Sequence, residues 1–99
     1  MPLFTVDCRD RDDAGDLRAQ TRPAHLDWLA AHAGRVRLAG PRLDGHGRAV
    51  GTLAIVEADD LGAAVAWAAQ DPYAHAGLFA TTAVEAWRVA VGGFGERQG

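Results

Sequence analysis

The sequence predicts a small α+β domain whose elements follow the order β-α-β-β-α-β. Two observations carry this prediction. Segments with the two-residue period of a strand alternate with segments that have the 3.6-residue period of a helix, and glycine, proline and aspartate separate them. The 99 residues suffice for one core only. We expect a single domain over residues 1–99, with residues 92–99 as a loose C-terminal tail.

The composition excludes several classes of protein. Hydrophobic residues make up 48% and charged residues 23% of the chain, as in a globular domain. A formal charge of −3 and scattered arginines offer no patch for a nucleic-acid backbone. No apolar run approaches the ~20 residues of a membrane span, and Cys8 has no second cysteine to pair with. We expect a cytoplasmic protein with no nucleic acid and no membrane as partner.

The first strand is predicted over residues 2–8. Phe4, Val6 and Cys8 alternate with their neighbours there, which is the period of a half-buried strand. The run of arginines and aspartates that follows, over residues 9–15, is expected to form a solvated connection.

The first helix is predicted over residues 23–33. Pro23 fits a first helical turn better than a helix interior, and Asp16 or Thr21 can cap the helix. Gly34 stands where a helix ends. Residues at helical spacing form the expected apolar stripe: Leu26, Leu29, Ala30 and Ala33.

A hairpin is predicted in the middle of the chain. Residues 36–40 alternate as a second strand, which Gly40-Pro41 is expected to end, because proline disfavours further strand pairing. Residues 43–48 are rich in turn formers, and residues 49–57 are predicted to form the third strand.

A second helix and a last strand complete the predicted fold. Asp59 or Asp60 can cap the helix, and Asp71-Pro72 is expected to end it, because a residue before proline disfavours helical geometry. Residues 79–91 are rich in β-branched and aromatic side chains and predict the fourth strand. The expected apolar stripe of the helix is Leu61, Ala64, Val65 and Ala68.

This order matches the ferredoxin-like split βαβ arrangement, in which two helices cover one face of an antiparallel four-stranded sheet. The open face is expected to be apolar too, because Leu53, Ile55 and Trp87 alternate with the residues that face the helices. An exposed apolar face of this size is uncommon on a monomer. We therefore expect a homodimer that packs sheet against sheet.

Two residues carry the candidate chemistry, and each also has a structural explanation. His25 falls in the first turn of the predicted first helix, off its apolar stripe, where a histidine is often simply solvated. Asp71 before Pro72 is a common way to end one helix and cap a new turn. Together His25 and Asp71 could form a dyad, in which the carboxylate fixes the tautomer and leaves the other ring nitrogen basic.

No pattern of metal ligands appears in the sequence. His25 and His32 share a helix face but lie about 10 Å apart along its axis, and His46 and His75 fall in loops. We therefore expect no metal site. Three further residues are expected to have packing roles: Trp28, Trp67 and a buried, inert Cys8.

Several motifs give the chain a resemblance to a known family. They are Arg22-Pro23-Ala24-His25-Leu26, Gly40-Pro41, Gly51-Thr52, and Asp71-Pro72-Tyr73 followed by Ala76-Gly77-Leu78. With these motifs in order, the chain resembles the YCII-related family over nearly its whole length. The resemblance implies a dimeric ferredoxin-like α/β barrel with a His–Asp active site, which falls here on His25 and Asp71. Many members carry Gly-Ser where this chain has Gly51-Thr52, so the hydroxyl is kept.

The resemblance also implies proton transfer on small ring compounds without a cofactor, as in relatives similar to muconolactone isomerase and to a dehydrochlorinase. We expect an isomerase or lyase in which His25, held by Asp71, is general base toward a small organic acid, lactone or ring compound. Arg22, Thr52 and Tyr73 are expected to contact this small-molecule ligand. The alternative is a non-catalytic dimeric module that binds a small ligand or a protein. A barrel monooxygenase of similar fold ranks below both, because fold alone does not carry function.

Overall fold

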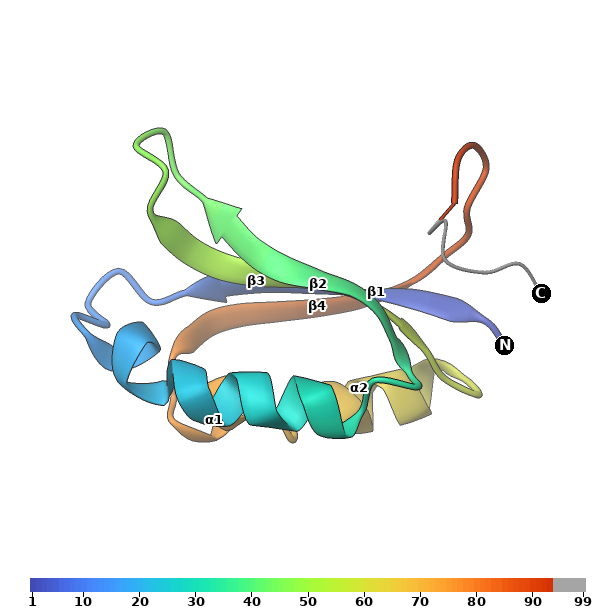
Figure 1. Ribbon diagram of the computed structural model, residues 1–99, viewed down its shortest axis with the longest axis horizontal. Helices are drawn as coiled ribbons and strands as arrows, with labels where there is room; N and C mark the ends of the chain where they lie inside the picture. The colour runs from blue at the N-terminus through green and yellow to red at the C-terminus, as the bar shows by residue number, and fades with distance from the viewer. Residues whose placement is uncertain (94–99) are drawn as a thin grey trace.

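The computed structural model describes residues 1–93 and confirms the predicted order of elements. Strands β1 (Leu3–Asp10), β2 (Val36–Leu43), β3 (Ala49–Glu57) and β4 (Phe79–Trp87) form one antiparallel sheet in the order β2-β3-β1-β4. Helices α1 (Leu17–Ala31), α2 (Leu61–Ala68) and the short α3 (Pro72–His75) lie on one side of the sheet (Figure 1). The fold is therefore α+β and ferredoxin-like. Most of the predicted tail, residues 94–99, lies outside the described residues.

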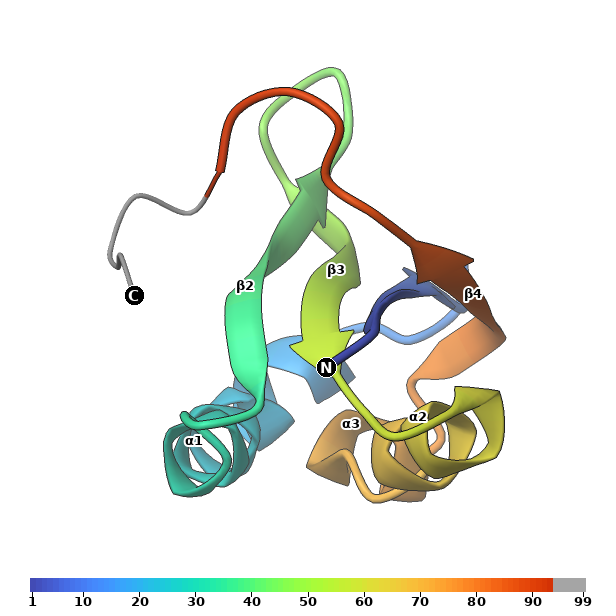
Figure 2. The same cartoon turned by 90° about the vertical axis from the view of Figure 1, so that its right-hand side faces the viewer.

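The core lies between the sheet and the helices. Phe4, Val6 and Cys8 on β1 are buried, as their alternation predicts, and Ala54 and Val56 on β3 are buried beside them. Figure 2 shows α1 beside α2 and α3, which together cover the inner face of the sheet. This arrangement brings α1 and α3, which are far apart in the sequence, against each other.

Helix α1 begins at Leu17, earlier than predicted, and Pro23 lies in its interior. Proline leaves the carbonyl of Ala19, four residues before it, without its helical hydrogen bond. Ala19 is on the exposed side of the helix, where water can satisfy that carbonyl. Both predicted caps are wrong, because Asp16 precedes the helix without a capping side-chain bond and Thr21 lies inside it.

The face that α1 turns to the core also differs from the predicted stripe. Leu26 is 42% exposed and Ala30 is exposed, whereas His25 is only 6% exposed. Trp28 and Leu29 pack against the core beside it. Of the two explanations of His25, the solvated side chain is therefore wrong. A buried imidazole needs a hydrogen-bond partner, and hydrophobic periodicity alone does not reveal a partner that comes from a distant segment.

Helix α2 shows a similar departure. Asp60 caps it as predicted, since its side chain accepts a hydrogen bond from the Ala63 N–H at 2.8 Å. Leu61 and Val65 are about half exposed, while Trp67 is 4% exposed. The Trp67 ring stacks on the ring of Trp28 on α1, with centroids 4.3 Å apart. This large aromatic contact, rather than the leucine and valine, sets which face of α2 is buried. Of its predicted stripe, only Ala64 and Ala68 are buried.

Strand β2 does not end at Gly40-Pro41 but continues to Leu43. Pro41 lies opposite Thr52 of β3. Because β2 is an edge strand, proline is tolerated where a central strand would lose a ladder hydrogen bond. The predicted third strand over residues 49–57 is confirmed, and β4 ends at Trp87 rather than at residue 91.

The outer face of the sheet carries exposed apolar side chains. Leu38 is 53% exposed, Leu53 38% and Trp87 41%, and the strand register places all three on the side away from the helices.

Within residues 1–93, the structure contains no helix with the length and apolar character needed to cross a membrane.

Candidate functional site

The structure brings His25 and Asp71 into contact. Nδ1 of His25, on α1, lies 2.9 Å from Oδ1 of Asp71, which directly precedes α3. The same oxygen accepts a hydrogen bond from the backbone N–H of Tyr73 at 2.9 Å, and Pro72 occupies the first turn of α3. Both side chains of the pair are buried. Asp71 therefore caps α3 and holds the imidazole with one oxygen.

Tyr73 fixes the plane of the imidazole. Its ring stacks on the His25 ring, with centroids 4.1 Å apart and planes 22° apart, and Tyr73 is 1% exposed. Burial raises the pKa of Tyr73, although the nearby Arg18 and Arg22 lower it in part. The phenol consequently stays protonated at neutral pH, and Tyr73 forms a neutral wall of the site.

A cavity of about 220 Å³ opens beside the pair, between α1, β2 and β3. Four of the five predicted site residues line it, namely Arg22, His25, Thr52 and Tyr73, while Asp71 lies behind His25. Within residues 1–93, Nε2 of His25 makes no hydrogen bond, and it is not one of the fully buried polar atoms that lack a partner. The free nitrogen therefore remains accessible at a lined cavity.

Thr52 and Arg22 differ in how firmly they are held. Thr52 is 5% exposed, and its Oγ1 accepts a hydrogen bond from Nη2 of Arg18 at 2.9 Å. Its own hydroxyl proton is left to donate elsewhere. Arg22 is exposed and makes no hydrogen bond or ion pair with the part of the chain that the structure describes.

Sequence reasoning missed Arg18 and its partner Asp10. Nε of Arg18 lies 2.7 Å from Oδ2 of Asp10, and Nη2 lies 2.9 Å from Oδ1, which makes a two-pronged ion pair. The expectation of a solvated connection is wrong for Asp10, because it ends β1 and its side chain is 11% exposed. Arg18 precedes His25 by two helical turns on the same face. A correct helix start would have revealed this relation.

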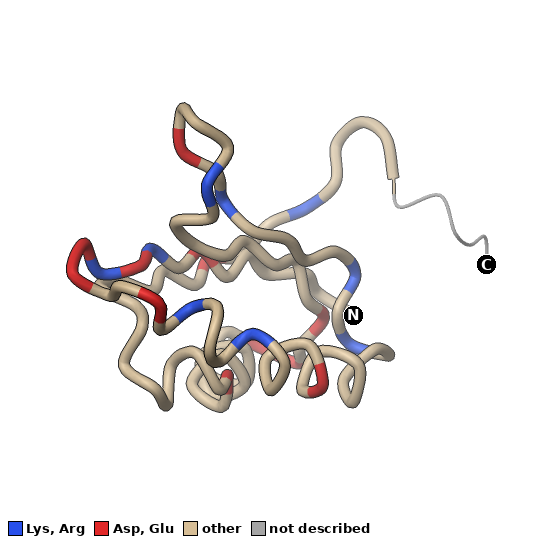
Figure 3. The backbone as a smooth tube through the Cα atoms, turned by 60° about the vertical axis from the view of Figure 1, so that its left-hand side comes forward, with Lys and Arg blue, Asp and Glu red and all other residues tan. Residues whose placement is uncertain are grey.

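The charges around the site are mixed. Figure 3 shows acidic and basic residues interspersed along the connection between β1 and α1. Burial lowers the pKa of Arg18, but Asp10 and other neighbours raise it by more than burial lowers it, so that the guanidinium stays charged.

Burial raises the pKa of Cys8 to about 11, in agreement with the expected inert thiol. Residues 1–93 contain no cluster of three side chains that could hold a metal ion.

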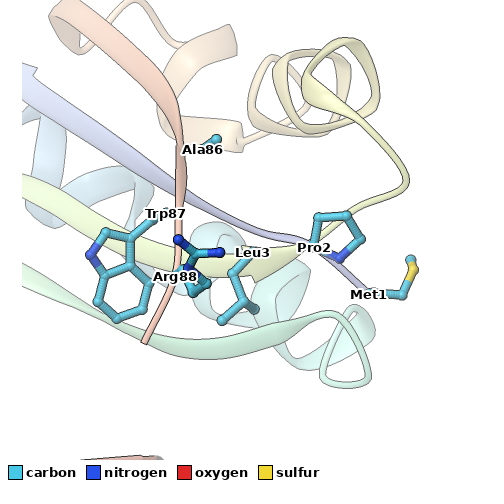
Figure 4. Close-up of a pocket in the computed structure, with 6 residues that line it drawn as sticks. All are labelled: Met1, Pro2, Leu3, Ala86, Trp87 and Arg88. Carbon is cyan, nitrogen blue, oxygen red and sulfur yellow. The ribbon is translucent and has the colours of Figure 1, made fainter. Parts of the chain in front are cut away.

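A larger hollow, about 570 Å³, lies at the opposite end of β1. Figure 4 shows the side chains that line it, which come from the start of β1 and the end of β4: Met1, Pro2, Leu3, Ala86, Trp87 and Arg88. None of these side chains is a general base or a nucleophile. The candidate chemistry is therefore concentrated in the smaller cavity beside His25.

The geometry defines a class: a ferredoxin-like α+β protein with a buried His–Asp pair at the wall of a small cavity. The family model of the YCII-related domain matches residues 3–88, and the chain belongs to the YCII-related family. It is 34% identical over 94 residues to Protein YciI of Escherichia coli O6:H1 and to Protein YciI of Shigella flexneri. Each alignment covers 87% of this chain and 96% of the relative.

A solved structure is also similar to this chain. It is 5-chloro-2-hydroxyhydroquinone dehydrochlorinase (TftG) from Burkholderia phenoliruptrix AC1100, in complex with 2,5-dihydroxybenzoquinone. The TM-score is 0.82 at 31% sequence identity, and the match covers 89% of this chain and 95% of that chain. The family and the fold predicted from the sequence are thus confirmed.

Proposed function

We propose that this protein is a small cofactor-independent enzyme, an isomerase or a lyase, that transfers a proton on a small organic acid, lactone or ring compound. One observation carries the proposal. Asp71 holds Nδ1 of His25, and Nε2 is left without a partner at the cavity. With its proton on Nδ1, the neutral imidazole presents the lone pair of Nε2 to a ligand and serves as general base.

The neighbouring groups support this role. The carboxylate of Asp71 stabilises the imidazolium that forms when Nε2 takes a proton. The stacked ring of Tyr73 keeps the imidazole from rotating away from the cavity. A base that returns the proton at a second carbon gives isomerisation, whereas departure of a leaving group after proton removal gives elimination. Both reactions use the same His25.

The size of the cavity supports a single-ring substrate. About 220 Å³ is below the roughly 300–1,000 Å³ of pockets for drug-sized ligands. TftG, whose structure holds 2,5-dihydroxybenzoquinone, is named for the dehydrochlorination of a single-ring compound. We infer a substrate of similar size for this chain. We also propose that the reaction takes place in the cytoplasm.

Chloride release from 5-chloro-2-hydroxyhydroquinone and isomerisation of muconolactone, followed by NMR, test this proposal. We expect turnover of one of these compounds by the wild type and its loss in His25→Ala. His75→Ala serves as the matched control, because His75 is an exposed histidine outside the cavity. Equal turnover by wild type and His25→Ala would contradict the role of His25.

The alternative is a ligand-binding module in which the pair is only a clamp. The observation that favours it is the second bond of Asp71, to the N–H of Tyr73, because this bond already explains the aspartate as a helix cap. In that case His25 merely joins α1 to α3. A variant that keeps the cap but removes the carboxylate charge, Asp71→Asn, separates the two functions.

We also propose that two copies of the chain pack through their outer sheet faces. The exposed side chains of Leu38, Leu53 and Trp87 support this, since a second copy would remove them from water. Leu3, which pairs with Trp87 across β1 and β4, continues the same face.

A further inference from the structure

Arg18 has donors that the fold does not use. A guanidinium carries five N–H groups. Nε and one N–H of Nη2 bind Asp10, and the other N–H of Nη2 binds Thr52. The two N–H groups of Nη1 make no hydrogen bond within residues 1–93, and Nη1 is not among the fully buried atoms that lack a partner. One edge of a firmly held cation is therefore open.

This cation lies close to the candidate base. Cζ of Arg18 is 4.5 Å from the centroid of the Tyr73 ring, and the His25 ring is 4.1 Å from the same centroid. The distance from Cζ of Arg18 to the centroid of the His25 ring therefore cannot exceed the sum of these two distances. Arg18 and His25 also line the same cavity. Both groups are therefore available to a ligand in this cavity.

The walls of this cavity favour a negative ligand. Arg18 and Arg22 line it, and no carboxylate does so within the described residues. A neighbouring cavity of about 410 Å³ also shares Arg18, but there Arg11 and Arg48 lie together with three carboxylates, those of Asp10, Asp12 and Asp44, so that its lining carries no net charge. An anion is therefore better accommodated on the His25 side of Arg18 than on the other.

We propose that Nη1 of Arg18 binds an anionic oxygen of the ligand, a carboxylate or a ring phenolate, and so orients the ligand toward Nε2 of His25. The inference rests on the proposed function, because it places the ligand in the His25 cavity. The inference restricts the proposed substrates to single-ring anions and excludes neutral rings. Arg18 rather than the exposed Arg22 is assigned this role, because Asp10 and Thr52 already fix its guanidinium.

Calorimetric titration of the full chain with benzoate and with its neutral analogue benzamide tests the proposal. The wild type should bind benzoate at least about tenfold more tightly, because charge-assisted hydrogen bonds are roughly twice as strong as neutral ones. Arg18→Gln should remove this preference and leave the affinity for benzamide unchanged. Arg11→Gln is the matched control, since Arg11 lines only the neighbouring cavity and loses the same charge. It should keep the preference.

Equal binding of the two compounds by the wild type would overturn the proposal. So would an equal loss for both compounds in Arg18→Gln, the outcome expected of a purely structural ion pair. Circular dichroism checks the fold, and Arg18→Lys, which keeps a cation near Asp10, is the second variant if Arg18→Gln does not fold. It should weaken benzoate binding but not benzamide binding. If His25→Ala retains turnover while Arg18→Gln loses the preference, the proposed chemistry fails and the anion site stands.

Discussion

Oδ1 of Asp71 lies 2.9 Å from Nδ1 of His25 and 2.9 Å from the backbone nitrogen of Tyr73. A single carboxylate oxygen thus accepts two hydrogen bonds, one that caps α3 and one that positions the imidazole. The structural and the catalytic explanations of Asp71 are for this reason compatible. Substitutions can still separate them, because the cap needs only an oxygen and the proposed base needs a charge.

Asp71→Asn should keep the fold and lose the activity. Asparagine caps helices about as well as aspartate, so the free energy of unfolding should fall by no more than about 1 kcal/mol. Turnover should fall at least about 100-fold, because a neutral amide does not stabilise the imidazolium of His25. Urea unfolding and steady-state kinetics measure the two effects. Unchanged turnover would favour the clamp over the catalytic pair.

Asp71→Ala is the comparison for this variant. It removes the cap and leaves Nδ1 of His25 buried without its partner, so the free energy of unfolding should fall by about 2–4 kcal/mol. A loss of the same size in Asp71→Asn would show that the charge itself stabilises the fold.

The sequence predicts most of the sheet, because the alternation of residues such as Phe4, Val6 and Cys8 depends only on local geometry. The faces of the helices are less predictable. Whether Leu26 or His25 of α1 is buried depends on Asp71, which lies 46 residues further along the chain. Hydrophobicity alone predicts that the leucine is buried. The structure buries the histidine instead, because Asp71 supplies the hydrogen-bond partner that a buried imidazole needs.

The candidate site shows the same division. Local motifs around Pro72 and Pro23 identify Asp71 and His25, but they do not identify Arg18. A predicted helix that starts at Pro23 does not include the turn that carries Arg18. The sequence pattern therefore does not indicate which face of the helix Arg18 occupies, nor that it contacts Asp10 and Tyr73.

Cys8 should make stability depend on pH above 9. Burial raises the pKa of its thiol from the ordinary 9.0 to about 11 in the folded protein. Between these values the unfolded chain loses the proton while the folded chain keeps it, so ionisation favours the unfolded state. The free energy of unfolding should fall as the pH rises from 9 to 11, and the effect is absent below 9.

Guanidinium unfolding of the wild type and of Cys8→Ala at several pH values checks this. Other titrating groups contribute equally to both proteins, so the difference between the two curves isolates the thiol. The fall in the free energy of unfolding that is due to the thiol should be confined to the range between pH 9 and 11. Parallel curves over this range would show that Cys8 ionises as easily in the folded chain as in the unfolded one.

Gly51 should not tolerate a side chain. A Cβ at this position would lie 2.4 Å from the carbonyl oxygen of Cys8 and 3.1 Å from Cδ of Arg42. Gly51→Ala must therefore push β3 away from β1, next to Thr52, at a cost of about 1–3 kcal/mol in the free energy of unfolding. Urea unfolding measures this cost.

Gly34→Ala is the control for this variant, because a Cβ at Gly34 meets no atom within 4 Å and its φ is not positive. Its stability should be unchanged or raised by up to about 1 kcal/mol, since alanine restricts the unfolded chain. If the two variants are equally stable, the close approach of β3 to β1 is not a constraint on the fold.

Leu53→Asp should convert the proposed dimer to a monomer. Leu53 lies on the outer sheet face and is 38% exposed, so the charge disturbs a contact between copies rather than the core. Leu61→Asp is the matched control: Leu61 is 49% exposed but belongs to α2, on the other side of the sheet. Light scattering after size exclusion at micromolar concentration should give twice the chain mass of 10.4 kDa for the wild type and Leu61→Asp, and the single mass for Leu53→Asp. A wild type that elutes at the single mass would refute the dimer, and the apolar outer face would then need another occupant.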